Sequence, residues 1–264
     1  MAEQSFGINN IEKEAWELFE VGSYDEVISL ASKNPGNLSL SHLGLVARYE
    51  RGDGNSVDYV DAVKKGKSLF SSLVSSYISN YLNNKNEAFT HLIDYYKQKN
   101  KLLCYTIINY SVKLAYEIRA YKECLAIMNL LKNKADQASF VLERMDCYYY
   151  LKMYQELIGT FRANFKLVDT NYDMHVKAGL ALFELGMYKE SETLLKKVPG
   201  SRKMETFEEK YELYRNMITK IPQIEKQKDQ LSEKELKELG FAYLFNADYQ
   251  KAEETFKKVI ALTK

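Results

Sequence analysis

Histidine is the side chain best suited to acid–base catalysis and metal binding near neutral pH, and the chain contains three of them. His42, His91 and His175 lie far apart, and none has a second histidine or a cysteine at metal-ligand spacing. No HExxH motif surrounds them. We therefore expect ordinary core or surface histidines, with a catalytic or metal-binding role as the alternative.

Cysteine could supply a nucleophile, a disulfide or a metal ligand, but the three cysteines are odd in number and widely spaced. Cys104, Cys124 and Cys147 form no CxxC pair, and each falls within a helical pattern of apolar residues. Buried free thiols are the simplest interpretation, and they suit a reducing compartment. The N-terminus has no basic segment followed by an apolar run, so we expect no signal peptide and a cytoplasmic location.

Motifs that bind phosphate or calcium are also missing from the sequence. There is no GxxxxGK[ST] or GxGxxG loop, and Arg51-Gly52-Asp53-Gly54 has the residues of a turn. Asp53 and Asp58 are too few for an EF-hand loop. The sequence therefore predicts no catalytic residues, no metal and no cofactor, in a protein that is not an enzyme.

The overall charge is nearly balanced, with 37 Lys+Arg against 36 Asp+Glu. Short lysine runs, such as Lys196-Lys197, are interpreted as solvated helix faces, with a nucleic-acid patch as the alternative. No stretch approaches the ~18 apolar residues that a membrane span needs. We therefore expect no nucleic-acid partner and no membrane partner.

The elements that must position any site are helices in a repeating order. A motif Gly-x-Tyr-x-x-small, with an apolar residue four positions later, occurs along the chain in strict or relaxed form. Its tyrosines are Tyr24, Tyr121, Tyr154, Tyr188 and Tyr249, and the middle three are separated by 33 and 34 residues. A period near 34 residues, with two helices in each unit, indicates a stacked helical repeat.

Eight units fit this period, at residues 8–35, 38–68, 69–98, 101–132, 136–166, 170–199, 203–231 and 232–264. The six units in 8–199 are predicted helical hairpins, several of them degenerate; 203–231 is an irregular helical unit or connector; 232–264 is a C-terminal hairpin. We expect all of them to form one continuous solenoid domain.

Particular residues mark the helices of the weaker units. In the second unit, the second helix is expected to run through Val57, Val60 and Val63. In the irregular unit, a helix from Met204 to Ile221 is expected to be interrupted by Pro222. Ser232 and Glu235 have the spacing of a capping box that opens the last unit.

At the level of these residues, the chain resembles the tetratricopeptide repeat (TPR) family. The last unit carries the resemblance best, through Leu239-Gly240, Tyr243, Ala247, Tyr249, Ala252, Phe256 and Val259, and the unit around 178–198 is nearly as good. The resemblance implies an all-α fold, a right-handed α–α superhelix of helical hairpins. It also implies a protein-binding role. In such arrays the first helix of each unit lines the concave side, where a partner would bind.

Small residues at the helix crossings have an independent physical reason. Gly44, Gly179 and Gly240 lie inside predicted helices, where glycine costs ~1 kcal/mol relative to alanine. Close approach of the facing helix explains why these positions lack a side chain, and Ser191 and Ala252 would serve the same purpose from the second helix.

Positions one and four after each crossing residue should point to the concave side. They are Trp16, Phe19, Leu45, Arg48, Tyr77, Asn80, Lys113, Tyr116, Asp146, Tyr149, Leu180, Phe183, Phe241 and Leu244. Such a stripe of aromatic and aliphatic groups suits recognition of a peptide or helix. The alternative is that tight packing buries these side chains. The first position of each pair never holds the asparagine that chaperone-docking family members use to clamp a carboxylate, so that clamp is not expected.

The sequence thus favours a non-catalytic scaffold, adaptor or assembly factor that binds another protein. One alternative is a structural subunit of a larger complex or homo-oligomer. A second, from another class, is an enzyme or nucleic-acid binder that uses residues 200–235.

Overall fold

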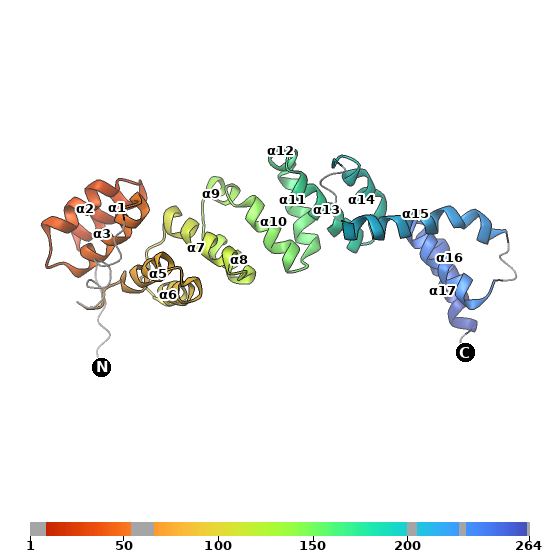
Figure 1. Cartoon of the computed structure of the whole chain (residues 1–264), viewed down its shortest axis with the longest axis horizontal. Coiled ribbons are helices and arrows are strands. Elements are labelled where there is room, and N and C mark those ends of the chain that lie inside the picture. The colour runs from red at the N-terminus through yellow and green to blue at the C-terminus, as the bar shows by residue number, and fades with distance from the viewer. Residues whose placement is uncertain (1–8, 54–65, 200–204, 227–230, 263–264) are drawn as a thin grey trace. The chain divides into compact units, whose positions relative to one another are not determined.

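The computed structural model describes residues 9–53, 66–199, 205–226 and 231–262, and every regular element within these ranges is a helix (Figure 1). This confirms the predicted all-α class. The chain divides into two compact units, an N-terminal unit that ends at Ala138 and a C-terminal unit that begins at Ser139.

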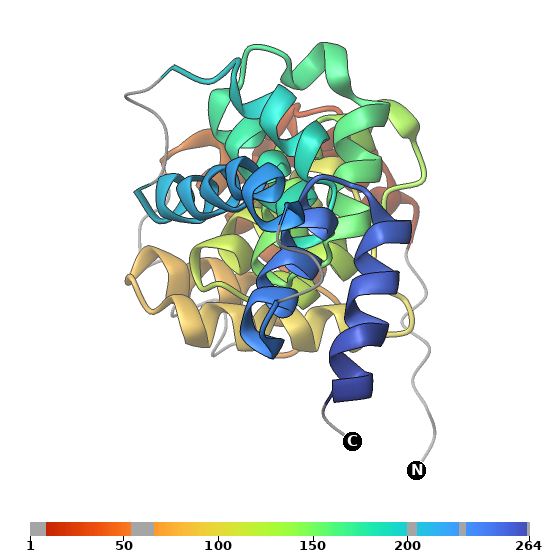
Figure 2. The same cartoon turned by 90° about the vertical axis from the view of Figure 1, so that its right-hand side faces the viewer.

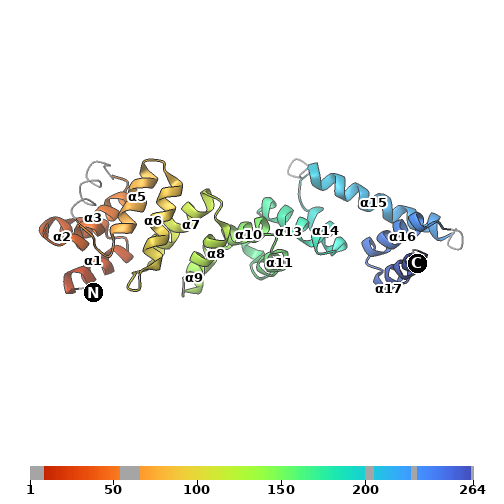
Figure 3. The same cartoon turned by 90° about the horizontal axis from the view of Figure 1, so that it is seen from below.

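The N-terminal unit consists of helical hairpins. Its helices are α1 (Asn10–Glu20), α2 (Tyr24–Lys33), α3 (Leu38–Arg51), α5 (Ser71–Tyr81), α6 (Lys85–Lys97), α7 (Tyr105–Glu117), α8 (Tyr121–Met128) and the short α9 (Lys134–Ala138). Helices α1 and α2, α5 and α6, and α7 and α8 pack as consecutive pairs, as Figure 3 shows for α5 and α6, while α3 packs on α2. The helix expected through Val57, Val60 and Val63 lies outside the described residues.

The C-terminal unit repeats this pairing. Its helices are α10 (Val141–Tyr150), α11 (Tyr154–Ala163), the short α12 (Phe165–Val168), α13 (Tyr172–Glu184), α14 (Tyr188–Leu195), α15 (Glu205–Glu225), α16 (Glu233–Phe245) and α17 (Tyr249–Leu262). Helices α10 and α11, α13 and α14, and α16 and α17 form hairpins, and Figure 2 shows α16 and α17 side by side. The long α15 packs on α16 rather than on a second helix of its own.

One turn geometry ends the first helix of each predicted unit, except the irregular one. The residue that ends each helix has a positive φ, between 58° and 89°, in all seven cases: Gly22, Gly52, Asn83, Arg119, Lys152, Gly186 and Ala247. It is the C-cap itself in α3 and the residue after the C-cap in the other six helices. Its N–H donates to the carbonyl three residues back, and the next N–H donates to the carbonyl five residues back; for Lys152 and Met153 these bonds are 3.1 Å and 2.8 Å long. This is the Schellman motif, which satisfies the last helical carbonyls.

The crossing glycines lie against side chains of the facing helix. A Cβ at Gly179 would lie 2.5 Å from Leu195 Cγ, and one at Gly240 would lie 2.7 Å from Phe256 Cε1. At Gly44 the distance to Ala31 Cβ would be 2.7 Å. These distances are shorter than normal van der Waals contact, which confirms that close helix packing requires glycine at these positions.

The predicted interruption at Pro222 is wrong, because α15 continues through this residue to Glu225. Proline removes one backbone hydrogen bond and crowds the preceding turn, but contacts on both sides of it hold the helix. Ile221 is buried in a cluster with α16 residues such as Leu239. Beyond the proline, Glu225 accepts a hydrogen bond from the phenol of Tyr243. Tertiary packing therefore overrides the local signal.

Two other local predictions are confirmed. The Ser232 hydroxyl accepts from the N–H of Glu235, whose carboxylate accepts from the N–H of Ser232 at 2.8 Å, so the capping box is present. Cys104, Cys124 and Cys147 are buried free thiols, and burial raises the pKa of Cys104 to about 11. No helix among the described residues is long and apolar enough to cross a membrane.

Candidate functional site

Five of the side chains predicted to face a partner are buried instead. Trp16, Phe19, Leu45 and Tyr77 belong to the core of the N-terminal unit, and Asp146 is buried in the C-terminal unit. The ring of Trp16, for example, stacks on that of Phe70 at a centroid distance of 5.9 Å. In these four units, the position directly after the crossing residue is therefore buried rather than accessible.

The other predicted residues lie at or near the surface. Arg48, Asn80, Tyr116, Tyr149, Leu180, Phe183 and Leu244 are half-buried, and Lys113 and Phe241 are exposed. Asn80 and Lys113 are brought together with groups that the sequence pattern did not select.

These two residues line the α3–α7 groove, a pocket of about 240 Å³ in the N-terminal unit. The groove is formed by the first helices of three successive units, and its lining residues are Tyr49, Glu50, Asn80, Asn109, Tyr110, Lys113, Leu114 and Glu117. Polar and aromatic groups therefore share one accessible surface.

Three tyrosine rings support this groove from below. Tyr77 of α5 stacks on Tyr110 of α7, with centroids 3.9 Å apart and planes at 12°, and Tyr49 of α3 meets Tyr77 edge-on at 4.6 Å. Their hydroxyl groups are also bonded: Tyr110 to Ser76 at 2.9 Å, and Tyr49 to the donating amide of Asn80 at 3.1 Å. The rings fix three helices relative to one another and hold the lining groups in place.

Burial changes the acidity of the groups in this cluster. The pKa of Glu50 is raised, because loss of solvent outweighs the hydrogen bond from Tyr77 and the attraction of Lys113. Burial likewise raises the pKa of Tyr49 and Tyr110 above that of a free phenol. The phenols therefore remain neutral hydrogen-bonding groups at physiological pH.

The groove carries charges of both signs. Lys113 is exposed and lies one helical turn after Asn109 on α7. Glu117 lies one turn after Lys113, and its carboxylate forms an ion pair with Lys85 of α6 at 3.1 Å. Glu50 adds a second carboxylate. Asparagine offers both a donor and an acceptor, which matches the polar groups of a peptide backbone. The site can therefore make directed hydrogen bonds to a polypeptide without requiring a strongly charged one.

A sequence signal for this face was present in α7. Asn109, Lys113 and Glu117 are spaced four residues apart in a helix whose other residues are mostly apolar, and this spacing places them on one stripe of its surface. Tyr49 and Glu50 had no comparable signal, because they lie near the end of α3 and the groove also needs residues of α5 and α7.

Asp146 has a structural partner rather than an exposed carboxylate. It forms an ion pair with Lys177 of α13, and the two side chains are only 12% and 16% exposed. The Lys177 ammonium also lies 6.0 Å from the centroid of the Tyr149 ring. This arrangement joins α10 to α13 within the C-terminal unit.

The histidines occupy the structural positions expected of them. His42 and His175 are buried; His42 Nδ1 lies 2.7 Å from Ser68 Oγ, and His175 Nδ1 lies 3.0 Å from the Asn171 carbonyl oxygen. His91 is on the surface, with Nε2 3.8 Å from a Glu87 carboxylate oxygen. Within the described part of the chain, no group of three or more His, Cys, Asp or Glu side chains could hold a metal ion.

Solved structures similar to this chain include two that align with 95% or more of it. The human IFIT1 dimer with PPP-AAAA is 13% identical over 96% of this chain and 72% of that chain, with a TM-score of 0.37. A tetratricopeptide repeat protein from Parabacteroides merdae ATCC 43184 is 10% identical over 95% of this chain and 91% of that chain, also with a TM-score of 0.37. No protein-family model and no curated protein matches the chain.

The hairpins, the recurrent turn and the crossing glycines of the chain itself define its architecture. Consecutive helices pack as hairpins in both units, and Gly44, Gly179 and Gly240 lie where two facing helices approach closely. Within the described residues, the fold is an all-α array of repeated helical hairpins.

Proposed function

We propose that the chain is a non-catalytic protein-interaction module, a scaffold, adaptor or assembly factor, that binds a peptide or helix of a partner protein in the α3–α7 groove. The observation that supports this most is that hydrogen-bonding side chains of three helices line one groove and are held by a stack of buried aromatic rings. Preorganised rings and polar groups reduce the entropy lost on binding.

The size of the groove also favours a polypeptide. Its volume of about 240 Å³ is below the 300–1,000 Å³ typical of sites that enclose a small-molecule substrate. A single side chain with its flanking backbone fits such a space. Asn80 and Asn109 would bond the backbone of the bound segment, and Lys113 would select a partner with an acidic group nearby.

A capture experiment tests this proposal with a matched control. The 264-residue chain is immobilised and used to capture partners from native cell extract. Two variants are compared with it: Asn109→Ala/Lys113→Glu in the groove and, as the control, Lys122→Glu at an exposed position of α8. We expect the groove variant to lose specific partners that the wild type and the α8 variant retain. Equal capture by all three proteins would show that the groove is not the binding surface.

Light scattering distinguishes the structural-subunit alternative. An adaptor is expected to be monomeric when purified alone, whereas a subunit of a homo-oligomer assembles with itself. We further propose a cytoplasmic location, which the three buried free thiols support because disulfides are rare in reducing compartments.

A further inference from the structure

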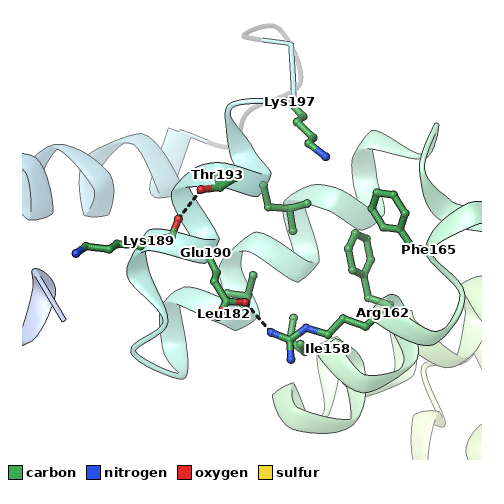
Figure 4. Close-up of a pocket in the computed structure, with 10 residues that line it drawn as sticks. Ile158, Arg162, Phe165, Leu182, Lys189, Glu190, Thr193 and Lys197 are labelled. Carbon is green, nitrogen blue, oxygen red and sulfur yellow. Dashed lines mark hydrogen bonds and ion pairs between the residues drawn. The ribbon is translucent and has the colours of Figure 1, made fainter.

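The C-terminal unit contains a second, larger pocket, which lies between α11 and α14 with α13 beneath it (Figure 4). Its volume is about 400 Å³, within the range of sites that hold ligands. Helices α11 and α14 are both second helices of their hairpins, so this surface belongs to a different face of the repeat from the α3–α7 groove. We call it the α11–α14 pocket.

The floor of the α11–α14 pocket is apolar. Ile158, Phe161 and Leu182 form its base and are each 5% exposed, whereas Phe165 and Leu194 at its edge are half-buried. Figure 4 shows the ring of Phe165 on the opposite side of the pocket from Thr193 and Lys189 of α14. An apolar side chain that entered would displace water from both aromatic and aliphatic surface, which is favourable.

The rim of the pocket is positively charged. Arg162, Lys189 and Lys197 line it together with one acidic residue, Glu190, which leaves a net charge of +2. Arg162 pairs with Glu190 at 2.6 Å, so that carboxylate is already neutralised. The Lys197 ammonium lies 5.4 Å from the centroid of the Phe165 ring, directly beside the apolar floor.

We propose that the α11–α14 pocket binds an acidic segment of a partner protein that inserts one large apolar side chain. The inserted side chain would contact Phe165 and Leu194, and a neighbouring carboxylate of the partner would pair with Lys197. Lys189, at the other end of α14, would attract a second acidic residue. Charge complementarity of this kind sets specificity and speeds association.

A polyanion fits this surface less well than an acidic peptide. Nucleic acid binding needs cations along the path of many phosphates, but α14 places Glu190 and Glu192 between Lys189 and Lys196. A peptide, unlike a nucleic acid, need not carry a negative charge at every position, so its carboxylates can lie next to the cations and away from Glu190 and Glu192. The site is in a different unit from the α3–α7 groove and does not depend on the function proposed there.

Synthetic peptides labelled with fluorescein provide the probe. The first contains one phenylalanine among glutamate and serine residues; the second replaces phenylalanine with alanine; the third replaces glutamate with lysine. Fluorescence anisotropy with the 264-residue chain is expected to detect binding of the first peptide but not of the second or the third. Its affinity should fall as salt rises, because exposed charges are screened.

Two variants place the binding at this pocket. Lys189→Glu/Lys197→Glu should weaken binding of the first peptide about tenfold or more, by reversing the rim charge. Thr193→Trp changes an exposed lining residue to fill the entrance, and should also abolish binding while leaving the helical circular-dichroism spectrum unchanged. Lys122→Glu/Lys132→Glu makes the same change in net charge on the N-terminal unit and should bind like the wild type.

Three results would overturn the proposal. The first is that the acidic phenylalanine peptide does not bind. The second is that the two pocket variants bind this peptide as tightly as the control Lys122→Glu/Lys132→Glu does. The third is displacement of the peptide by a single-stranded RNA oligonucleotide whose own binding is lost in Lys189→Glu/Lys197→Glu, since that would assign the pocket to nucleic acid. Changes in the α3–α7 groove should leave all these results unaffected.

Discussion

The phenol of Tyr77 donates a hydrogen bond of 2.6 Å to the carboxylate of Glu50, and thereby joins the buried stack of tyrosines to the accessible α3–α7 groove. Tyr77 is fully buried, while Glu50 lies on the groove surface. The bond crosses from α5 to α3. A single contact therefore orients a charged group at the proposed binding surface and holds two neighbouring repeat units together.

Tyr77→Phe should remove this bond and keep the stacking with Tyr110. Removing the hydrogen-bond donor of a partly buried carboxylate costs roughly 1–3 kcal/mol, so we expect the free energy of unfolding to decrease by that amount. Urea denaturation followed by circular dichroism measures it. Tyr81→Phe changes an exposed tyrosine at the end of the same helix and should have little effect. Equal stability of the two variants would contradict a role for the bond.

Glu50→Gln should change how stability depends on pH. Because burial raises the pKa of Glu50 in the folded protein, folding favours its protonated form. This contribution is complete below the pKa of the unfolded chain and is lost as the pH rises through the folded pKa. Glutamine can still accept from Tyr77 but does not ionise, so the variant should gain stability relative to the wild type as pH increases.

Urea denaturation of both proteins between about pH 4 and pH 8 tests this sign. Glu14→Gln, at an exposed position of α1, provides the control. A difference between Glu50→Gln and the wild type that stays constant over this range, or that decreases with pH, would be inconsistent with a raised pKa.

Gly179→Ala and Gly159→Ala should act in opposite directions. A Cβ at Gly179 meets three atoms of the buried Leu195 side chain at 2.5–2.7 Å, so overpacking should destabilise the protein by ~1–3 kcal/mol. A Cβ at Gly159 meets no atom within 4 Å, and alanine inside α11 should stabilise it by ~0.5–1 kcal/mol. Thermal melts compare the two. Adding Leu195→Ala to Gly179→Ala should cost less than the sum of the single changes, because the clash is removed.

Lys177→Met should destabilise the protein strongly by removing the cationic partner of Asp146. Breaking a largely buried ion pair from one side costs about 3 kcal/mol, since the remaining charge loses its compensation. The double variant Asp146→Leu/Lys177→Met should be more stable than the single one. The exposed pair of Lys257 and Glu253, 2.7 Å apart, gives the control, and Lys257→Met should change denaturation little. Similar losses in the two methionine variants would argue against burial as the cause.

Lys152→Gly should stabilise the protein, unlike most glycine substitutions. Lys152 has φ = 58°, a left-handed conformation that costs a residue with a Cβ roughly 1–2 kcal/mol. The greater conformational freedom of glycine in the unfolded chain offsets part of the stabilisation gained by relieving this conformation. We therefore expect the free energy of unfolding to rise by about 1 kcal/mol. Lys122→Gly, inside α8, should instead destabilise. A loss of stability in Lys152→Gly would show that the turn is not strained.

Periodic features of the fold were predictable from the sequence, and pairwise features were not. The helices, the turns and the crossing glycines follow from local pattern, since a close approach such as that of Gly179 and Leu195 recurs once in each strong unit. The accessible face was predicted poorly because the rule that positions one and four after the crossing residue are accessible does not hold for five side chains: Trp16, Phe19, Leu45, Tyr77 and Asp146. Tyr77 is buried by Tyr110, and Asp146 is paired with Lys177.

The error at Pro222 has the same origin. The tendency of proline to interrupt a helix is a local property, whereas Ile221 and Glu225 are held by residues of α16 that lie later in the chain. The α11–α14 pocket is likewise formed by side chains from four helices, α11 to α14, so the residue spacing within any one helix does not indicate it.

The seven Schellman turns have a consequence for how such repeats are recognised. The left-handed residue is glycine at Gly22, Gly52 and Gly186, but asparagine, arginine, lysine or alanine at the other four positions. The helix carbonyls that accept the two turn bonds fix the torsion angle whatever side chain is present. What these units have in common is a backbone angle rather than a residue type. Comparing repeats by their torsion angles would therefore identify members that a residue-by-residue alignment misses.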